Sequence, residues 1–243
     1  MTKSFHLSDQ PLRQVLGGIR STLVPEHPVE VSARPRPRAF IAISRAAGAG
    51  GSTLARRLVD RLNHAGVSPA WEAYDRELCE KISAEHQVAQ DLVSGLEERS
   101  RNWLEEFFAG FPGSDAHPIS DIALFRRVAT TVRALAQRGH VVLVGCGSPF
   151  ITRDMPGAIS VRLVAPLEHR IAAMARQWQT SLDDAARRVK SVDAARVAFY
   201  RTWWPAHALS PEEFMLTLNA GLLSEDEMAE AVVGMLARRV ALA

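Results

Sequence analysis

Residues 39–53 read AFIAISRAAGAGGST, and this stretch decides the fold. Its first five residues form a short apolar run that is typical of a fully buried strand. A turn rich in glycine and alanine follows at residues 46–51. Residues 54–62 then place Leu and Val at helical spacing among Arg and Asp residues. The stretch therefore predicts a buried strand, a tight turn and an amphipathic helix in direct succession.

Small residues in a strand-to-helix turn suit an anionic ligand, because backbone N–H groups can converge on a phosphate without side chains in the way. The first turn of the helix adds unpaired N–H groups and the positive end of the helix dipole. The hydroxyl of Ser52 or Thr53 is placed to meet Mg²⁺, directly or through water. We expect six consecutive residues to bind the phosphates of ATP: Gly48, Ala49, Gly50, Gly51, Ser52 and Thr53.

The turn departs at two positions from the standard phosphate-loop pattern, G-x-x-x-x-G-K-[ST]. With Gly50 aligned on the second glycine, Arg45 stands at the first glycine and Gly51 at the lysine. The lysine normally bridges the β- and γ-phosphates, so its absence removes a charge that catalysis uses. We expect Arg45, or arginines from elsewhere in the chain, to supply that charge. The alternative is a glycine-rich turn that binds nothing.

Outside this stretch, short apolar runs alternate with helical patterns. Strands are predicted at 70–74, 141–144, 159–164 and 214–218, and helices over much of 76–138 and at 167–178, 181–204 and 224–240. Such alternation implies parallel β-α-β units with helices on both faces of the sheet. We therefore predict one α/β domain at residues 39–243. It follows an extension at residues 1–38 that ends in an Arg-Pro linker.

The composition is that of an ordinary soluble protein, with 47% hydrophobic and 23% charged residues. A formal net charge of +2 gives no reason to expect nucleic acid as a partner. The start of the chain lacks the apolar core of a signal peptide, and no segment offers the roughly 20 apolar residues that span a bilayer. Cys79 and Cys146 read as free thiols of a reducing compartment. These features predict a cytoplasmic protein without a membrane partner.

Several short motifs, in order along the chain, resemble the cytidylate kinase-like family of P-loop proteins. They are I-S-R at 43–45, G-A-G-G at 48–51, Y-D-R-E-L at 74–78, V-L-V-G-C-G at 142–147, V-R-L-V-A-P-L-E-H-R at 161–170, D-x-x-R-x-x-x-Y at 193–200 and L-N at 218–219. The resemblance covers most of residues 39–240, and Gly51 in place of lysine looks like a trait of that family. It implies the nucleoside-monophosphate kinase architecture: a parallel sheet, a helical acceptor-binding subdomain and an arginine-bearing lid at roughly 170–205.

The resemblance also implies the reaction, which is transfer of a phosphoryl group from ATP, with Mg²⁺, to a nucleoside monophosphate such as CMP. A lid that closes over the donor would bring guanidinium groups to the charge that develops on the transferred group. On the lid helix, Asp193 lies on one stripe with Arg196 and can hold it in place. For any single arginine the alternative is a solvated basic face. We expect catalytic roles for four arginines: Arg45, Arg170, Arg196 and Arg201.

Three residues are expected on the acceptor side. Asp75 ends a strand at the carboxyl edge of the sheet, where ligands of open α/β folds bind, although it could equally cap the helix that begins at Arg76. Arg76 either contacts a phosphate or pairs with Glu80. Cys146 stands where the family places an arginine that faces the acceptor, and a thiol cannot make that charged, two-pronged contact.

The sequence leaves two questions open. Aromatic residues at 103, 107, 108, 199, 203 and 204 predict either a base-stacking platform or packing, in the core or at a homodimer surface. The missing lysine and the thiol at position 146 also fit a non-catalytic nucleotide-binding regulatory module with a degenerate P-loop. A small-molecule kinase with another class of acceptor is a third reading, because this scaffold hosts many reactions.

Overall fold

The computed structural model describes residues 38–64, 66, 69–75, 96–109, 119–205 and 209–242. Five strands in these residues form one parallel sheet in the order β2-β3-β1-β4-β5. They are β1 (Phe40–Arg45), β2 (Glu72–Asp75), β3 (Val141–Val144), β4 (Ala158–Val164) and β5 (Leu216–Asn219). The sheet confirms the predicted α/β class with a parallel core. Residues 1–37 of the predicted extension lie outside the described residues.

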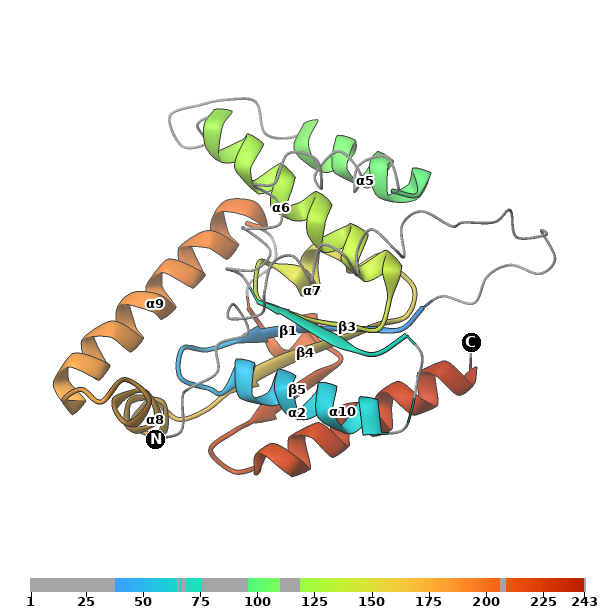
Figure 1. Cartoon of the computed structure of the whole chain (residues 1–243). Coiled ribbons are helices and arrows are strands. Elements are labelled where there is room, and N and C mark those ends of the chain that lie inside the picture. The colour runs from blue at the N-terminus through green and yellow to red at the C-terminus, as the bar shows by residue number, and fades with distance from the viewer. Residues whose placement is uncertain are drawn as a thin grey trace.

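Helices cover both faces of this sheet (Figure 1). One face carries α2 (Gly51–His64) and α10 (Glu225–Leu242), and the other carries α6 (Ile119–Arg138) and α7 (Ser148–Ile151). Helix α5 (Glu98–Ala109) packs on the outer side of α6. Helices α8 (Leu167–Trp178) and α9 (Leu182–Trp203) lie together at the end of the sheet where β1 leads into α2.

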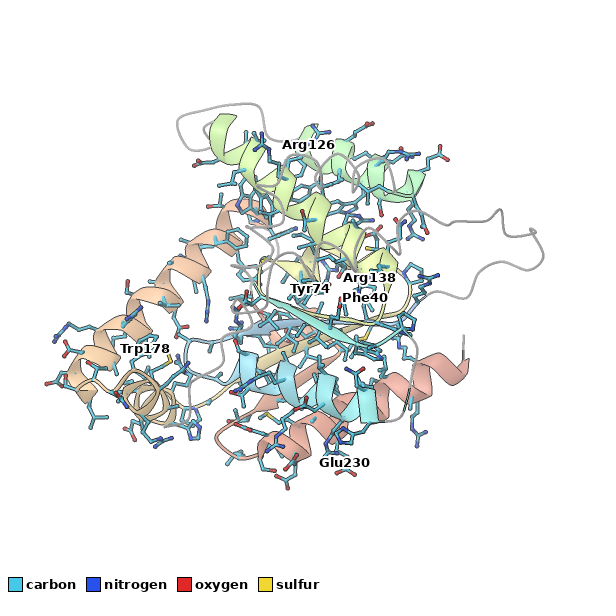
Figure 2. The ribbon with its side chains drawn as sticks, in the orientation of Figure 1. Phe40, Tyr74, Arg126, Arg138, Trp178 and Glu230 are labelled. Atoms are coloured by element: carbon cyan, nitrogen blue, oxygen red, sulfur yellow. The ribbon has the colours of Figure 1, made fainter. Side chains whose placement is uncertain are left out.

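The central strand β1 is apolar from Phe40 to Ile43 because these residues are buried on both faces of the sheet. Phe40 and Ala42 pack in the core on the side of α6, whereas Ile41 and Ile43 pack in the core on the side of α2 and α10. Phe40 and Tyr74 both belong to the α6-side core, and Figure 2 labels them together with Arg138. Arg138 Nη1 donates a hydrogen bond of 3.2 Å to the Tyr74 hydroxyl. A continuous apolar run is the pattern of a strand covered on both sides.

The carboxyl-terminal half of α9 fixes that long helix to the body of the domain. Its aromatic residues pack in the α6-side core, where Trp203 lies 4.2 Å from Phe125 and Tyr200 lies 5.2 Å from Phe150, centroid to centroid. Such ring pairs dominate core energetics because each buries a large apolar area. The anchoring holds the amino-terminal half of α9 at the carboxyl edge of the sheet (Figure 1).

Most predicted elements are present with small shifts at their ends. The helix predicted at 167–178 is confirmed as α8, and the one predicted at 181–204 is α9, Leu182–Trp203. Strand β5 begins at Leu216, later than predicted. The short helix α7 was not predicted, because it occupies one turn and follows Gly147 in the left-handed region. Residues 76–95 and 110–118 of the stretch predicted to be largely helical lie outside the described residues. None of the helices in the described ranges is long and apolar enough to cross a membrane.

Candidate functional site

The turn between β1 and α2 lies at the carboxyl edge of the sheet, as the sequence predicts. Gly48 and Gly50 both have positive φ angles, 76° and 81°, which glycine adopts without strain. A Cβ atom on Gly48 would lie 2.5 Å from the carbonyl oxygen of Arg170, so this position needs glycine for space as well. In the described part of the chain, no heavy atom beyond the two neighbouring residues lies within 4 Å of a Cβ built on Gly50. The turn is therefore packed against α8 at Gly48 and open at Gly50.

The backbone N–H groups divide the turn into two halves. In the first half, the N–H of Ala46 donates to the carbonyl of Leu163 at 2.9 Å, and that of Ala47 donates to a side chain of α9. Among the described residues no acceptor is found for the N–H groups of Gly48 or of residues 50–53. These groups include the first turn of α2, which has no intrahelical partners for them. The second half of the turn is thus a cradle of N–H donors with no protein acceptor in the described part of the chain.

The first half of the turn is held by α8 and α9. The N–H of Ala47 donates to Asp193 Oδ1 at 2.8 Å, and the carbonyl of Ala47 accepts from Arg170 Nη1 at 3.1 Å. Arg170 also pairs with the second oxygen of Asp193. One turn further along α9, Arg196 Nη1 donates to the carbonyl of Arg45 at 3.1 Å. The predicted lid helices therefore contact the turn directly, and Asp193 pairs with Arg170 instead of with Arg196 as the sequence suggested.

Arg45 crosses the end of the sheet from β1 to β3. A Cβ atom on Gly51 would lie 3.0 Å from Arg45 Cγ, and one on Gly145 would lie 1.8 Å from Arg45 Nη1. The stem of Arg45 thus runs along the position where a lysine side chain would begin, and its guanidinium group lies against the backbone that follows β3. Because Arg45 fills this space, a side chain at position 51 would force Arg45 to move. The two departures from the standard pattern are therefore coupled, because the Arg45 side chain occupies the space that a side chain at position 51 would need.

Arg162 belongs to the same cluster, although it was not among the predicted site residues. It lies opposite Ser44 in the register of β1 and β4, and its Nη1 donates to Ser44 Oγ at 2.8 Å. The buried hydroxyl groups of Ser44 and Tyr200 lie 3.3 Å apart. Arg162 is a charged residue near the carboxyl end of β4, the strand beside β1. A charge at that end of an otherwise apolar strand is the signal that could have identified it. Its contact with Ser44 depends on strand register, which the sequence did not supply.

The arginines of this cluster lie close enough for their positive charges to repel one another. Burial, followed by the positive charge of Arg45, lowers the pKa of Arg196 to about 10. Burial also lowers the pKa of Arg162, and the charges of Arg170 and Arg45 act in the same direction. At neutral pH these guanidinium groups still carry their charge. Repulsion of this kind falls when an anion binds between the cations, so the cluster favours a strongly anionic ligand.

A model of the cytidylate kinase-like family matches residues 40–221, which include the turn, the arginine cluster and α9. The chain belongs to the cytidylate kinase-like family. Arg45–Thr53 is the predicted P-loop of this family, and α8 and α9 cover most of the predicted lid at roughly 170–205. No curated protein matches the chain in a sequence comparison.

One of the similar solved structures has a TM-score high enough to support the fold. An uncharacterized protein from Eubacterium ventriosum shares 19% identity with a TM-score of 0.63, over 83% of this chain and 99% of that one. The Mycobacterium tuberculosis APS kinase CysC, in complex with AMPPNP and APS, shares 19% identity with a TM-score of 0.45, over 84% of this chain and 99% of that one. Shikimate kinase from Acinetobacter baumannii, in complex with shikimate, shares 16% identity with a TM-score of 0.41, over 83% of this chain and 94% of that one. The latter two TM-scores are too low to bear on the chemistry of this chain.

Cys146, which stands where the resemblance to the family implies an arginine, lies in an unusual backbone conformation. Gly145, Cys146 and Gly147 have φ angles of 87°, 57° and 73°, and positive φ is uncommon for a residue with a side chain. The half-buried thiol packs against the aromatic core on the α6 side. A Cβ atom on Gly147 would lie 2.7 Å from the ring of Trp204, so α9 presses on this turn. Position 146 therefore adds an apolar thiol, and the charge near it comes from Arg45. Cys79 lies outside the described residues.

The P-loop also bears on where a metal ion could be held. Ser52 and Thr53 lie in the first turn of α2, and both are partly exposed. In the described ranges no three His, Cys, Asp or Glu side chains gather where they could hold a metal ion. A metal at this edge would therefore depend on a hydroxyl and on the oxygens of a bound phosphate. Mg²⁺ is usually held in this way in phosphoryl-transfer sites, with few protein ligands.

The remaining predicted residues take different positions. Asp75 is the last residue of β2, in register with Val144 at the carboxyl edge, whereas Arg76 lies outside the described residues. Arg201 is exposed on α9, and no described contact joins it to the P-loop. The structure therefore groups Arg45, Arg170 and Arg196 at one edge and leaves Arg201 on the surface.

The predicted aromatic residues form a packed cluster. Phe108, Trp203 and Trp204 are buried, and Phe107 stacks on Trp103 with ring centroids 4.8 Å apart. Phe107 also lies 5.7 Å from Trp204, which links α5 to the end of α9. Core packing, one of the two readings from the sequence, is what these contacts show. The cluster joins α9 to the helical layer on the α6 side.

Proposed function

We propose that this protein transfers the γ-phosphoryl group of ATP to a nucleoside monophosphate of the CMP type. In this reaction the bond between the γ-phosphorus and the β–γ bridging oxygen breaks, and a phosphate oxygen of the acceptor bonds to the γ-phosphorus. ADP and a nucleoside diphosphate are the products. Membership in the cytidylate kinase-like family supports the class of reaction, and the acceptor is part of the proposal.

The observation that carries the proposal is the combination of open N–H donors with a crowded set of arginines. The N–H groups of residues 50–53 lack acceptors in the described part of the chain, and α2 directs its positive end toward them. Burial lowers the pKa of Arg162 and of Arg196, and the nearby positive charge of Arg45 lowers both further. A polyphosphate supplies oxygen acceptors for the N–H groups and negative charge for the guanidinium groups at once. A glycine-rich turn with a purely structural role would need neither feature.

Arg45 supplies the positive charge that the missing lysine would provide to the phosphates. Its stem follows the space over Gly51, and its guanidinium group reaches the end of β3, between the P-loop and the acceptor side. A guanidinium group binds phosphate through two parallel hydrogen bonds, whereas an ammonium acts as a point charge. Ser52 or Thr53 would hold Mg²⁺ together with phosphate oxygens, and the metal would neutralise charge on the β- and γ-phosphates.

A regulatory module that binds nucleotide without turnover is the second candidate. Two observations favour it: Cys146 gives the acceptor side no charge of its own, and Arg170 and Arg196 are already engaged with backbone carbonyls. Phosphoryl transfer depends on positioned cations, so an arginine committed to the protein contributes less to the transition state. Binding without product formation would support this candidate.

Turnover and binding measured together separate the two functions. Purified protein is incubated with ATP, Mg²⁺ and each of CMP, dCMP, UMP, AMP and GMP, and diphosphate products are quantified. Calorimetry gives the affinity for ATP under the same conditions. We expect a diphosphate product with a pyrimidine monophosphate. Binding of ATP without product from any acceptor would leave the regulatory module, and product with other acceptors alone would correct the proposed substrate.

A double-mutant cycle tests the role of Arg45. Arg45→Gly removes the guanidinium group, Gly51→Lys pushes a side chain into the Arg45 stem, and the double variant restores G-x-x-x-x-G-K-S. We expect each single variant to lower kcat/KM, or ATP affinity if turnover is absent, by about 100-fold, and the double variant to recover most of it. Arg56→Ala, at an exposed position of α2, is the control. An unaffected Arg45→Gly variant would show that Arg45 does not serve the phosphates.

A further inference from the structure

Asp193 occupies a position that suits an anionic ligand. Its carboxylate accepts a hydrogen bond from the N–H of Ala47 at 2.8 Å and pairs with the Arg170 guanidinium group. A backbone N–H of a P-loop together with an arginine is the set of donors that a phosphate oxygen would use. The side chain of Asp193 is 29% exposed, and that of Arg170 is 12% exposed. The carboxylate is therefore within reach of solvent, while the donors that it engages are nearly covered.

The surroundings of Asp193 carry positive charge from several elements. Arg170 on α8 pairs with it directly, and its negative charge also acts on Arg196 of α9 and on Arg162 of β4. The same two arginines are repelled by Arg45 at the end of β1. Asp193 thus offsets part of the positive charge of the cluster. A phosphate group carries more negative charge than one carboxylate and would offset more of it.

The position of Ala47 defines which part of a ligand meets Asp193. The open N–H groups of Gly48 and residues 50–53 follow Ala47 along the P-loop, and Ala47 lies at the far end of this row from α2. A short phosphate chain seated at the start of α2 can use the open donors and leave Asp193 in place. A longer chain extends toward Ala47 and meets the carboxylate. Only the longer ligand has to displace it.

We propose, resting on the nucleotide site inferred above, that Asp193 is an internal competitor for the terminal phosphate and sets the selectivity between triphosphate and diphosphate. In the free protein its carboxylate holds the N–H of Ala47 and the guanidinium group of Arg170. A triphosphate displaces the carboxylate and takes over both donors, so Arg170 is released to the terminal phosphate only when that phosphate is present. A diphosphate leaves the pair intact. The exchange swaps one anion for another, and no covalent bond changes.

Asp193→Asn is the decisive variant because it removes the charge and keeps the shape and one oxygen acceptor for Ala47. ATP and ADP are titrated by calorimetry into wild type, Asp193→Asn and the control Asp183→Asn, an exposed aspartate in the first turn of α9. We expect Asp193→Asn to bind ATP about tenfold tighter and ADP less than about threefold tighter, since one repulsive charge near the terminal phosphate is lost. The control should leave both affinities unchanged. Equal shifts for ATP and ADP, or weaker binding of ATP, would overturn the proposal.

A second measurement uses the wild-type chain and does not depend on the variant folding. The carboxylate carbon of Asp193 and the N–H of Ala47 are followed by NMR while ATP or ADP is added. We expect both signals to shift with ATP and neither to shift with ADP, and a shift with both ligands or with neither would refute the competition. If wild type binds no nucleotide at all, the proposed function fails by itself. The competition is then decided with inorganic tripolyphosphate against pyrophosphate in the same two assays.

Discussion

Two arginine–aspartate pairs in this protein have the same chemistry and opposite surroundings. Arg133 on α6 pairs with Asp154 through both carboxylate oxygens, at 2.8 and 3.0 Å, and donates to the carbonyl of Ile151 at 2.7 Å. Its guanidinium group also lies 4.6 Å from the ring of Trp103. Its side chain is fully buried. The guanidinium group of Arg133 is therefore engaged by other groups of the protein.

At the P-loop, the pair of Arg170 with Asp193 is set among further cations. The carboxylate of Asp193 is shared between Arg170 and the N–H of Ala47, and Arg45, Arg162 and Arg196 act on the same region. The first pair closes a structural contact, whereas the second leaves positive charge for a ligand. Both pairs consist of an arginine and an aspartate, and they differ in the number of further arginines nearby. A basic stretch of sequence therefore cannot distinguish a structural pair from a ligand-binding one.

The largest expected effect comes from breaking the structural pair. Asp154→Asn leaves the fully buried Arg133 without a carboxylate, and we expect it to lower the free energy of unfolding by about 3–5 kcal/mol. Asp193→Asn should cost less than about 1 kcal/mol, because the Asp193 side chain is 29% exposed and Arg170 keeps its hydrogen bond to the carbonyl of Ala47. Urea denaturation of both variants measures the two losses. Equal losses would mean that the P-loop pair is structural as well.

Acid provides a control for the structural pair. Burial acts to raise the pKa of Asp154, but the hydrogen bond and charge of Arg133 outweigh it, so the net pKa is lowered. A carboxylate with a lowered pKa contributes stability above its unfolded pKa of about 3.9 and loses it as the pH falls through the lower folded pKa. Wild type and Asp154→Asn should therefore converge in stability only below a pH of about 3.9. Convergence near neutral pH would assign the loss to another cause.

A smaller effect is expected when an anion relieves the surplus charge at the P-loop. Pyrophosphate at about 100 times its Kd should raise the free energy of unfolding by about 2.7 kcal/mol in wild type. The gain should fall as NaCl is added, because salt screens partly exposed charges. Arg45→Met should remove most of the gain, and Arg56→Ala should retain it. Thermal melts with and without pyrophosphate measure these differences, and a gain that survives in Arg45→Met would place the anion elsewhere.

The smallest effect calibrates both pairs against an ordinary surface contact. Arg61 Nη2 and Asp226 Oδ1 lie 3.2 Å apart between α2 and α10, with side chains 41% and 57% exposed. Exposed pairs contribute little because solvent screens them and two long side chains lose freedom. We expect Asp226→Ala to change the free energy of unfolding by less than about 1 kcal/mol, with no change in ATP affinity. A loss comparable to that of Asp154→Asn would make burial a poor guide to the strength of these pairs.

Local patterns in the sequence predicted much of the fold. The strand, turn and helix at residues 39–53 follow from an apolar run, small residues and helical spacing, all within one short window. The helices at 167–178 and 182–203 were placed closely for the same reason. Short elements were predicted less well. Helix α7 is one turn and strand β5 is four residues long, so neither carries enough periodicity to fix its ends.

The candidate site was predicted in part. The P-loop with Arg45, Arg170 and Arg196 was expected to form one site, and the structure brings these residues to one edge of the sheet. Arg162 was missed, because its contact with Ser44 depends on parallel strand register. The pairing of Asp193 with Arg170 joins residues on different helices, whereas helical spacing alone favoured Arg196.

The sequence by itself determined the family, the parallel α/β class and the place of the phosphate turn. These properties depend on neighbours along the chain and on motifs in order. Only the tertiary structure decided that Arg45 fills the space over Gly51, that Arg162 reaches Ser44, and that α9 contacts the turn through Asp193. Such contacts form between strands and helices far apart in sequence. Side-chain direction and strand register set them, and no local pattern encodes either.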